Sequence, residues 1–194
     1  MTPAFSIAVY CGSRPGTLPA YAHAAVAVGT WIGKHQGQLV YGGGNSGLMG
    51  IVANATKAAG GRVVGVIPHA LAAKEIARHD CDELYQVDTM HERKQIMAER
   101  ADAFLALPGG IGTFEELFEV WTWRQLEFHN KPMGLLNVDG YYDGLCAFMR
   151  TTVSQGFVSD WHLDFVQVSD DVQTLMPQLV EAAGLAKSDG WDRI

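Results

Sequence analysis

The stretch Leu105-Ala106-Leu107-Pro108-Gly109-Gly110-Ile111-Gly112-Thr113-Phe114-Glu115-Glu116 decides the fold class of this 194-residue chain. The apolar run 103–107 predicts a buried strand, and the residues from Phe114 to Trp121 keep apolar side chains at helical spacing. A strand therefore enters a glycine-rich turn that starts a helix. Such a turn leaves backbone amides uncovered, so it is suited to binding an anion such as a phosphate at the positive end of the helix.

Glu116 is the unusual residue of this stretch, because a negative charge in the first turn of the helix would repel a phosphate. One interpretation is structural: Thr113 and Glu116 have the spacing of a capping box, in which each side chain bonds the other's backbone amide. The other interpretation is chemical, with the Glu116 carboxylate facing another part of a bound ligand. The choice between them depends on other motifs.

Strands and helices alternate along the rest of the chain. The expected strands are 5–10, 38–41, 62–67, 84–87, 103–107, 132–138 and 165–168. The expected helices are 18–35, 48–59, 71–77, 90–101, the segment from the central glycine turn to about 128, 141–155 and 170–183. This order predicts an α/β fold, a Rossmann-like doubly wound parallel sheet with helices on both faces and ligands at the carboxyl ends of the strands.

Length and composition indicate a single globular domain. We place it in residues 1–186, with 187–194 as a C-terminal tail. No apolar run reaches membrane-spanning length and the N-terminus has no signal-peptide core, so we expect a cytoplasmic protein without a membrane partner. The net charge of −7 argues against a nucleic acid polymer as partner but allows a single nucleotide. Three scattered cysteines fit reduced thiols.

A second glycine-rich loop, Gly42-Gly43-Gly44-Asn45-Ser46-Gly47, follows another expected strand. Three of its glycines have the spacing of the dinucleotide fingerprint. The next strand, however, ends in Ile67-Pro68-His69 without an acidic residue for a ribose, and the loop lacks the lysine of a Walker motif. A nicotinamide cofactor and ATP are therefore unsupported. Two interpretations stay open: close packing of a helix on a strand, or a phosphate contact through Gly43 and Gly44.

The sequence Met90-His91-Glu92-Arg93-Lys94 starts another expected helix, with Thr89 and Glu92 at capping-box spacing. Arg93 and Lys94 put two cations in its first turn, where they oppose the helix dipole. A bound phosphate would compensate for them, because arginine grips phosphate oxygens in a bidentate fork. A salt bridge to a carboxylate, or solvation, would do the same. We expect this loop and the central one to end neighbouring strands.

The order of these two motifs, Met90 to Lys94 and then Pro108 to Glu116 after one helix and one strand, is specific. It resembles the signature of the Lonely Guy family of cytokinin-activating phosphoribohydrolases, proteins that have also been described as possible lysine decarboxylases. The resemblance extends over most of the chain, to Cys11-Gly12-Ser13, Tyr41-Gly42-Gly43-Gly44, Ile67-Pro68, Thr122-Trp123, Gln125-Leu126 and Lys131-Pro132.

The resemblance implies hydrolysis of the N-glycosidic bond of a nucleoside 5′-monophosphate, with AMP or N6-prenylated AMP as substrate and free base and ribose 5-phosphate as products. By motif position, Arg93 and Glu116 match the catalytic pair of the family. The positions that match its substrate contacts are Glu75, Arg93, Lys94, Gly110, Ile111, Gly112, Thr113, Phe114, Glu115, Glu116 and Thr122. Further candidate contacts of the nucleotide or its phosphate are Ser13, Gly43 and Gly44.

The residues suit this chemistry. Breaking a glycosidic bond passes through a sugar cation, which a carboxylate such as Glu116 stabilises while it orients or deprotonates the attacking water. Arg93 would hold the sugar phosphate or help the leaving base to accept charge. No metal or other cofactor is needed, and the seven histidines show no ligand spacing.

Two other functions compete with this one. A non-catalytic carrier would hold a phosphorylated ligand through the same loop, but it would gain nothing from the Glu116 carboxylate beside an anion. A lysine decarboxylase would need a pyridoxal cofactor on a lysine, for which Lys94 is best placed, in a chain that is short for the usual cofactor domain. Trp121 and Trp123 widen the apolar surface of the central helix, either for the core or for the homodimer that the resemblance also suggests.

Overall fold

The structure is a computed structural model that describes residues 2–72, 77–78 and 80–185. Its strands are β1 Ser6–Tyr10, β2 Gln38–Tyr41, β3 Arg62–Pro68, β4 Glu83–Val87, β5 Ala103–Ala106, β6 Met133–Leu136 and β7 Val166–Ser169. Its α-helices are α1 Pro19–Lys34, α2 Gly47–Ala58, α3 His69–Ala72, α4 Met90–Glu99, α5 Ile111–Gln125, α6 Asp143–Ser154 and α7 Val172–Ala182. Two short 3-10 helices are η1 Val138–Gly140 and η2 Asp160–Phe165.

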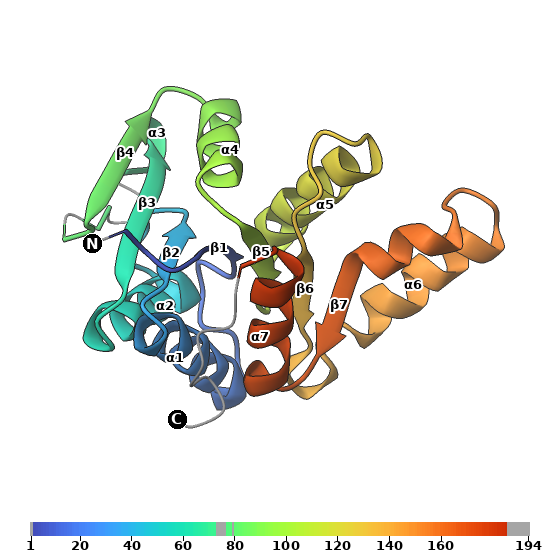
Figure 1. Cartoon of the computed structure of the whole chain (residues 1–194), viewed down its shortest axis with the longest axis horizontal. Coiled ribbons are helices and arrows are strands. Elements are labelled where there is room, and N and C mark those ends of the chain that lie inside the picture. The colour runs from blue at the N-terminus through green and yellow to red at the C-terminus, as the bar shows by residue number, and fades with distance from the viewer. Residues whose placement is uncertain (1, 73–76, 79, 186–194) are drawn as a thin grey trace.

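Seven parallel strands form one sheet in the order β4-β3-β2-β1-β5-β6-β7. The chain builds outward from β1 to β4 on one side, then returns to β5 on the other side of β1 and builds outward to β7 (Figure 1). The carboxyl ends of β1 and β5 therefore flank the point where the strand order reverses. Open α/β sheets bind their ligands at such a point.

Helices cover both faces of the sheet, which confirms the doubly wound prediction. Figure 1 shows α1, α2 and α7 on one face and α4 and α5 on the other. Alternate residues of β5 serve the two cores: Leu105 packs with the apolar residues of α1, α2 and α7, whereas Phe104 and Ala106 pack with those of α4 and α5. Because the central strands are buried on both sides, their sequences are continuous apolar runs.

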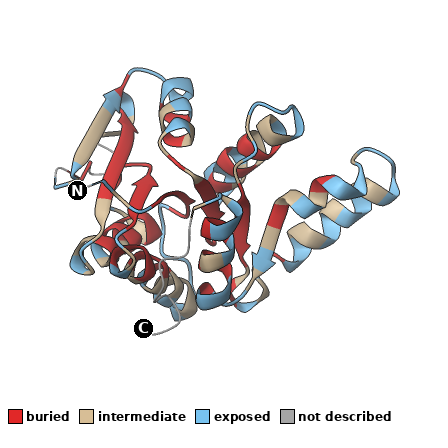
Figure 2. Ribbon diagram, in the orientation of Figure 1, coloured by how far each residue is buried: buried red, intermediate tan, exposed pale blue. Residues whose placement is uncertain are grey.

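The helix α6 packs only partly against the core on the α4 and α5 side, through Leu145, Cys146 and Met149. None of its residues is buried, and Phe148 is 61% exposed. Figure 2 shows α6 largely exposed beyond β7, whereas the strands at the centre of the sheet are buried. Trp121 of α5, in contrast, is buried and donates its Nε1–H to the carbonyl oxygen of His162 at 3.0 Å, so its apolar surface serves the core of this chain. No helix in the described part of the chain has the length and apolar character to cross a membrane.

Most expected elements are present with ends shifted by a few residues. The capping box of Thr89 and Glu92 is confirmed, because the Glu92 amide donates to Thr89 Oγ1 and the Thr89 amide to Glu92 Oε2, both at 3.1 Å. The structural interpretation of Thr113 and Glu116, that they form a capping box, is wrong. The helix α5 begins at Ile111 after Gly110 as N-cap, which puts Thr113 inside the first turn.

Two expectations concern the segment around β3 and α3. The strand expected at 62–67 is one residue longer in the structure, because β3 includes Pro68 as its last residue, where a missing amide interrupts little of the hydrogen-bond ladder. The helix expected at 71–77 is described only in part: α3 ends at Ala72, and residues 73–76 lie outside the described residues.

Candidate active site

A pocket of about 540 Å³ opens at the point where the strand order reverses. Its walls come from the loop after β1, the start of α2, the first turn of α4, the loop from Pro108 to Gly110 with the first turn of α5, and Tyr141 after β6. All of these segments lie at the carboxyl ends of strands, where a doubly wound sheet is expected to bind its ligand. The volume lies within the range of small-molecule sites.

The loop after β5 presents its glycines to this pocket. A Cβ atom on Gly110 or Gly112 would meet no heavy atom within 4 Å, so open space faces both residues. A Cβ on Gly109, in contrast, would lie 2.1 Å from Thr113 Oγ1, which explains why this position needs a glycine. No side chain caps the N-terminus of α5. The uncapped amides at the positive end of its dipole therefore belong to residues that line the pocket.

Arg93 and Glu116 meet on one wall of the pocket. Arg93 Nη2 lies 3.4 Å from Glu116 Oε1, and the two side chains are only 7% and 11% exposed. The buried Nε of Arg93 makes no hydrogen bond within the described part of the chain. A cation and a carboxylate are thus held together in a site largely closed to water. Among the described residues, the Nε–H of Arg93 stays available as a hydrogen-bond donor.

The route by which Arg93 reaches Glu116 differs from the expected one. We expected the strands before α4 and α5 to be neighbours, which is wrong, because β3, β2 and β1 lie between β4 and β5. The contact forms because α4 packs against β3 and β4, and the long Arg93 side chain extends over the end of β2. A Cβ on Gly42 would lie 2.1 Å from Arg93 Nη2. Glycine at position 42 therefore leaves the space that the guanidinium occupies.

Lys94 points away from the pocket although it is adjacent to Arg93. Its Nζ donates to Glu115 Oε1 at 2.5 Å and to Glu119 Oε1 at 3.0 Å, so two carboxylates of α5 hold it. Burial alone would lower the pKa of Lys94, but these hydrogen bonds outweigh burial and the pKa is raised. Lys94 thus stays charged and ties α4 to α5, and Glu115, which lines the pocket, is one of its two partners.

The second glycine loop is filled by protein rather than open to a ligand. Gly43 has a left-handed backbone (φ 76°), its carbonyl oxygen accepts from the Arg78 amide at 2.9 Å, and Gly44 forms an antiparallel bridge with Ala77. A Cβ on Gly43 would lie 3.0 Å from Ile67 Cβ. Neither Gly43 nor Gly44 lines the pocket, so the structure favours the packing interpretation of this loop.

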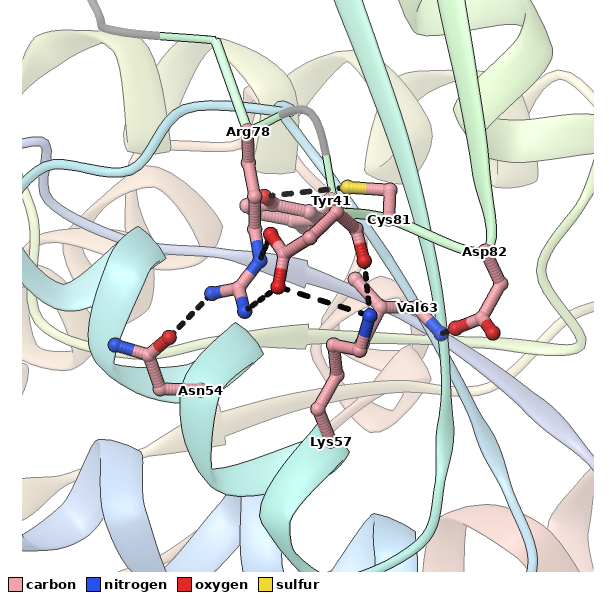
Figure 3. A network of polar contacts seen from close by, with 8 residues as sticks. Tyr41, Asn54, Lys57, Val63, Arg78, Cys81 and Asp82 are labelled. Carbon is pink, nitrogen blue, oxygen red and sulfur yellow. Dashed lines mark hydrogen bonds and ion pairs between the residues drawn. The ribbon is translucent and has the colours of Figure 1, made fainter.

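A polar network holds the segment that covers the second loop (Figure 3). The buried Arg78 donates to Asn54 Oδ1 at 2.5 Å and to Asp80 Oδ2 at 2.8 Å. Lys57 of α2 donates to the carbonyl oxygen of Asp80, and Tyr41 Oη lies 3.8 Å from Cys81 Sγ. Arg78, Asp80 and Cys81 are therefore fixed to α2 and to the end of β2.

The structure separates the remaining candidate residues into two groups. Those that line the pocket are Ser13, Arg93, Gly110, Ile111, Gly112, Thr113, Glu115 and Glu116. Lys94, Phe114 and Thr122 do not line it: Phe114 packs edge-on against Tyr142, with ring centroids 6.4 Å apart, and the exposed Thr122 hydroxyl donates to the Phe118 carbonyl within α5. Glu75 lies outside the described residues.

Among the pocket residues that sequence reasoning missed, one is a cation and two are tyrosines. Arg14 directly follows the Cys11-Gly12-Ser13 motif and adds a second cation, while Tyr21 and Tyr141 add aromatic walls. A cation two residues after a strand-end glycine was a usable signal for Arg14. No comparable signal marked the tyrosines, because they come from α1 and from the turn after β6, which only the fold brings together.

The charge of Glu116 affects the pKa values of two neighbouring side chains, Cys11 and Tyr10. Burial raises the pKa of the Cys11 thiol, and the nearby Glu116 carboxylate raises it further. The same two causes, in the same order, raise the pKa of Tyr10. Both side chains therefore stay protonated and neutral below the site. Within the residues that the structure describes, no group of three His, Cys, Asp or Glu side chains is placed to hold a metal ion.

The fold and the position of the pocket define a Rossmann-like α/β protein with a pocket at the switch point of its parallel sheet. A family model described as "Possible lysine decarboxylase" matches residues 49–179, and the chain belongs to this family. It is 52% identical to a probable cytokinin riboside 5'-monophosphate phosphoribohydrolase of Oryza sativa subsp. japonica over 79% of this chain and 62% of that protein. It is 47% identical to a cytokinin riboside 5'-monophosphate phosphoribohydrolase of Arabidopsis thaliana over 90% of this chain and 81% of that protein.

These relatives confirm the family resemblance drawn from the motifs. Among solved structures, the molybdenum cofactor carrier protein of Chlamydomonas reinhardtii is similar, with a TM-score of 0.71 at 21% identity over 95% of this chain and 99% of that chain. At that identity the likeness shows the fold alone. It confirms the Rossmann-like architecture.

The description of the family as decarboxylases finds no support at Lys94. A Schiff-base lysine must lose its proton to react with a carbonyl group. Lys94 is instead held by two carboxylates, which keep its proton on, and it does not line the pocket. The lysine best placed in the sequence for a pyridoxal cofactor is therefore a structural cation.

Proposed function

We propose that this protein hydrolyses the N-glycosidic bond of nucleoside 5′-monophosphates, with AMP or N6-prenylated AMP as substrate. The hydroxyl group of a water molecule would add to the anomeric carbon as the bond to the base breaks. The remaining proton of that water would go to the base, so the products are ribose 5-phosphate and the free base. The names of the relatives support a phosphoribohydrolase of this kind. The buried pair of Arg93 and Glu116 in the pocket is the observation that carries the proposal.

Glu116 has the position and chemistry of the central group. Glu116 lies in the second turn of α5, five residues after Ile111, and is largely shielded from water. A carboxylate there stabilises the positive charge that develops on the sugar and orients or deprotonates the attacking water. Low exposure strengthens this electrostatic effect, because little solvent screens it.

The rest of the pocket is suited to the two ends of a nucleotide. The uncapped amides at Ile111, Gly112 and Thr113 would bind the 5′-phosphate at the positive end of α5, with Arg14 as a nearby cation. Leu48 and Met49 of α2 offer apolar surface for a base. The Nε of Arg93 has no hydrogen-bond partner among the described residues, so it is a donor left for the sugar phosphate or the leaving base.

One further substrate contact, the oligomeric state and the cellular location are also proposals. Glu75 is proposed as a substrate contact from its motif position alone. A homodimer and a cytoplasmic location are proposed in the same way, from the family resemblance and from the composition of the chain.

The test is the substitution Glu116→Gln, which keeps the shape of the side chain and removes its charge. We expect it to lower the rate of base release from AMP and from N6-prenylated AMP by about 10²-fold to 10⁴-fold, the range for loss of a general acid or base. Nucleotide binding, measured by calorimetry, should stay within a few-fold of the unmodified protein. The matched control is Glu99→Gln, on the exposed side of α4 and outside the pocket.

Two results would contradict the proposal. Release of base by Glu116→Gln at the unmodified rate would remove Glu116 from the reaction. Binding of AMP by the unmodified protein without any release of base would favour the non-catalytic carrier instead.

A further inference from the structure

Three successive carbonyl groups in the loop after β5 are all held by hydrogen bonds. The Leu107 oxygen accepts from Tyr142 Oη at 2.6 Å, the Pro108 oxygen from the Gly12 amide at 3.1 Å, and the Gly109 oxygen from the Tyr141 hydroxyl. Two of the three donors are thus tyrosine hydroxyls from one turn, the turn after β6. Glycine-rich backbone has little rigidity of its own, so these bonds fix a loop that would otherwise be mobile.

The bond to the Gly109 carbonyl also fixes an amide. A trans peptide is planar, and its carbonyl and its N–H point in opposite directions. No peptide bond in the described residues is cis. By holding the Gly109 oxygen, the Tyr141 hydroxyl therefore sets the direction of the Gly110 N–H, on the N-cap residue of α5 that lines the pocket.

The turn that carries the two tyrosines is itself tightly constrained. Asp139 and Gly140 both have left-handed backbones, with φ of 53° and 71°. Asn137 stabilises the turn, because its Oδ1 accepts from the Tyr142 amide at 2.7 Å. A non-glycine residue in the left-handed region is strained and persists only where the surroundings hold it. The strain at Asp139 is consistent with a turn whose shape serves to direct the two tyrosines.

The two tyrosines differ in environment. Tyr142 is buried, and burial raises its pKa, so its hydroxyl remains a donor to the Leu107 carbonyl. Tyr141 is 37% exposed and lines the pocket, and its ring lies edge-on to Tyr21 with centroids 5.6 Å apart. Tyr142 therefore holds the loop from the buried side, while Tyr141 holds it from the side that lines the pocket.

We propose that Tyr141 is a positioning residue, whose hydroxyl holds the Gly109 carbonyl so that the Gly110 amide points at the phosphate of the bound nucleotide. This inference rests on the proposed function, because it assigns the phosphate to the loop after β5. It predicts that loss of one hydroxyl weakens phosphate binding without touching the carboxylate of Glu116.

The test compares Tyr141→Phe with Tyr85→Phe. Each substitution removes only a hydroxyl that donates a hydrogen bond, but Tyr85 lies on β4 away from the pocket and donates to Glu83. Dissociation constants for AMP and for ribose 5-phosphate are measured by calorimetry in the Glu116→Gln background, where turnover of AMP is slowed. We expect Tyr141→Phe to raise both constants by about tenfold, the value of one hydrogen bond to a charged group, and Tyr85→Phe to change neither.

Kinetics provide the second measurement. In the otherwise unmodified protein, Tyr141→Phe should raise KM for AMP by a similar factor and leave kcat within about twofold. Equal dissociation constants for the Tyr141→Phe protein and its parent would overturn the inference, and so would a fall in thermal stability with unchanged binding. Failure of the unmodified protein to release base would overturn only the proposed function, because the binding comparison does not depend on turnover.

Discussion

Two glycine-rich loops lie at the same edge of the same sheet and have opposite roles. The loop after β5 faces open space at Gly110 and Gly112, and it lines the pocket. The loop after β2 is occupied by protein: the Arg93 guanidinium fills the space beside Gly42, and the Ala77–Arg78 segment pairs with Gly43 and Gly44. In sequence, both are glycines between a strand and a helix.

The difference shows what a glycine at the end of a strand can signify. In one loop the missing side chains leave backbone amides open to a ligand, and in the other they leave room for the protein's own side chain and backbone. Arg93 joins the two, because its guanidinium packs on Gly42 and contacts Glu116 beside the pocket. The loop after β2 therefore helps to place Arg93 beside the pocket that the loop after β5 lines. Three predictions test that relation.

The largest effect is expected from Arg93→Ala. The substitution removes the cation beside Glu116, and we expect kcat/KM for AMP to fall by about 10²-fold to 10³-fold, as for loss of a preorganised donor in an active site. Steady-state kinetics measure this loss. Arg150→Ala, an exposed position on α6, is the control. A loss of only a few-fold for Arg93→Ala would mean that the two loops are not joined through this residue.

A smaller effect is expected from Gly42→Ala. The new methyl group would overlap Arg93 Nη2, and the flexible guanidinium can move aside, so the fold should survive with a cost of about 1–3 kcal/mol. Displacement of Arg93 should lower kcat/KM by about tenfold to 10²-fold, since a misplacement near 1 Å has effects of this size. Urea unfolding and kinetics on the same samples separate the two effects.

Gly144→Ala provides the matched control for that substitution. A Cβ on Gly144 would meet no heavy atom within 4 Å, and the residue lies in α6, outside the pocket. We expect unchanged kinetics and stability equal to or slightly above that of the unmodified protein, because alanine favours a helix over glycine. Unaltered activity in Gly42→Ala would show that the filled loop does not place Arg93.

The smallest effect is expected from Asp80→Asn, in the network that covers the filled loop (Figure 3). The hydrogen bond from Arg78 lowers the pKa of Asp80 below its ordinary value of 3.8, and the charge of Lys57 adds to this. A lowered pKa means that the carboxylate stabilises the fold above pH 3.8 and loses this contribution as the pH falls. Because the side chain is exposed, the contribution should stay below about 1 kcal/mol.

Urea unfolding at two pH values tests this prediction. Asp80→Asn should be slightly less stable than the unmodified protein at pH 7, and the difference should shrink as the pH falls below 3.8 and the Asp80 carboxylate becomes protonated. A difference that persists at low pH would show that the Asp80 side chain acts through packing rather than through its charge.

Local sequence patterns predicted most of the fold, for reasons that the structure makes clear. The strands are continuous apolar runs because helices cover both faces of the sheet, and the capping box at Thr89 marks the start of α4 by local hydrogen bonds. The capping box expected at Thr113 failed because spacing alone does not fix where a helix begins. Gly110 rather than Thr113 is the N-cap of α5.

By itself, the sequence determined the class of fold, the family, and the pairing of a basic helix start with a glycine loop and a glutamate, because these depend on local periodicity and on motifs read along the chain. Only the tertiary structure decided that β1, β2 and β3 lie between β4 and β5, and that Arg93 still reaches Glu116. It also decided that Lys94 turns to α5, and that Tyr141 reaches the loop after β5. The physical reason is that strand order and side-chain reach depend on how the layers pack, and local sequence does not encode those long-range distances.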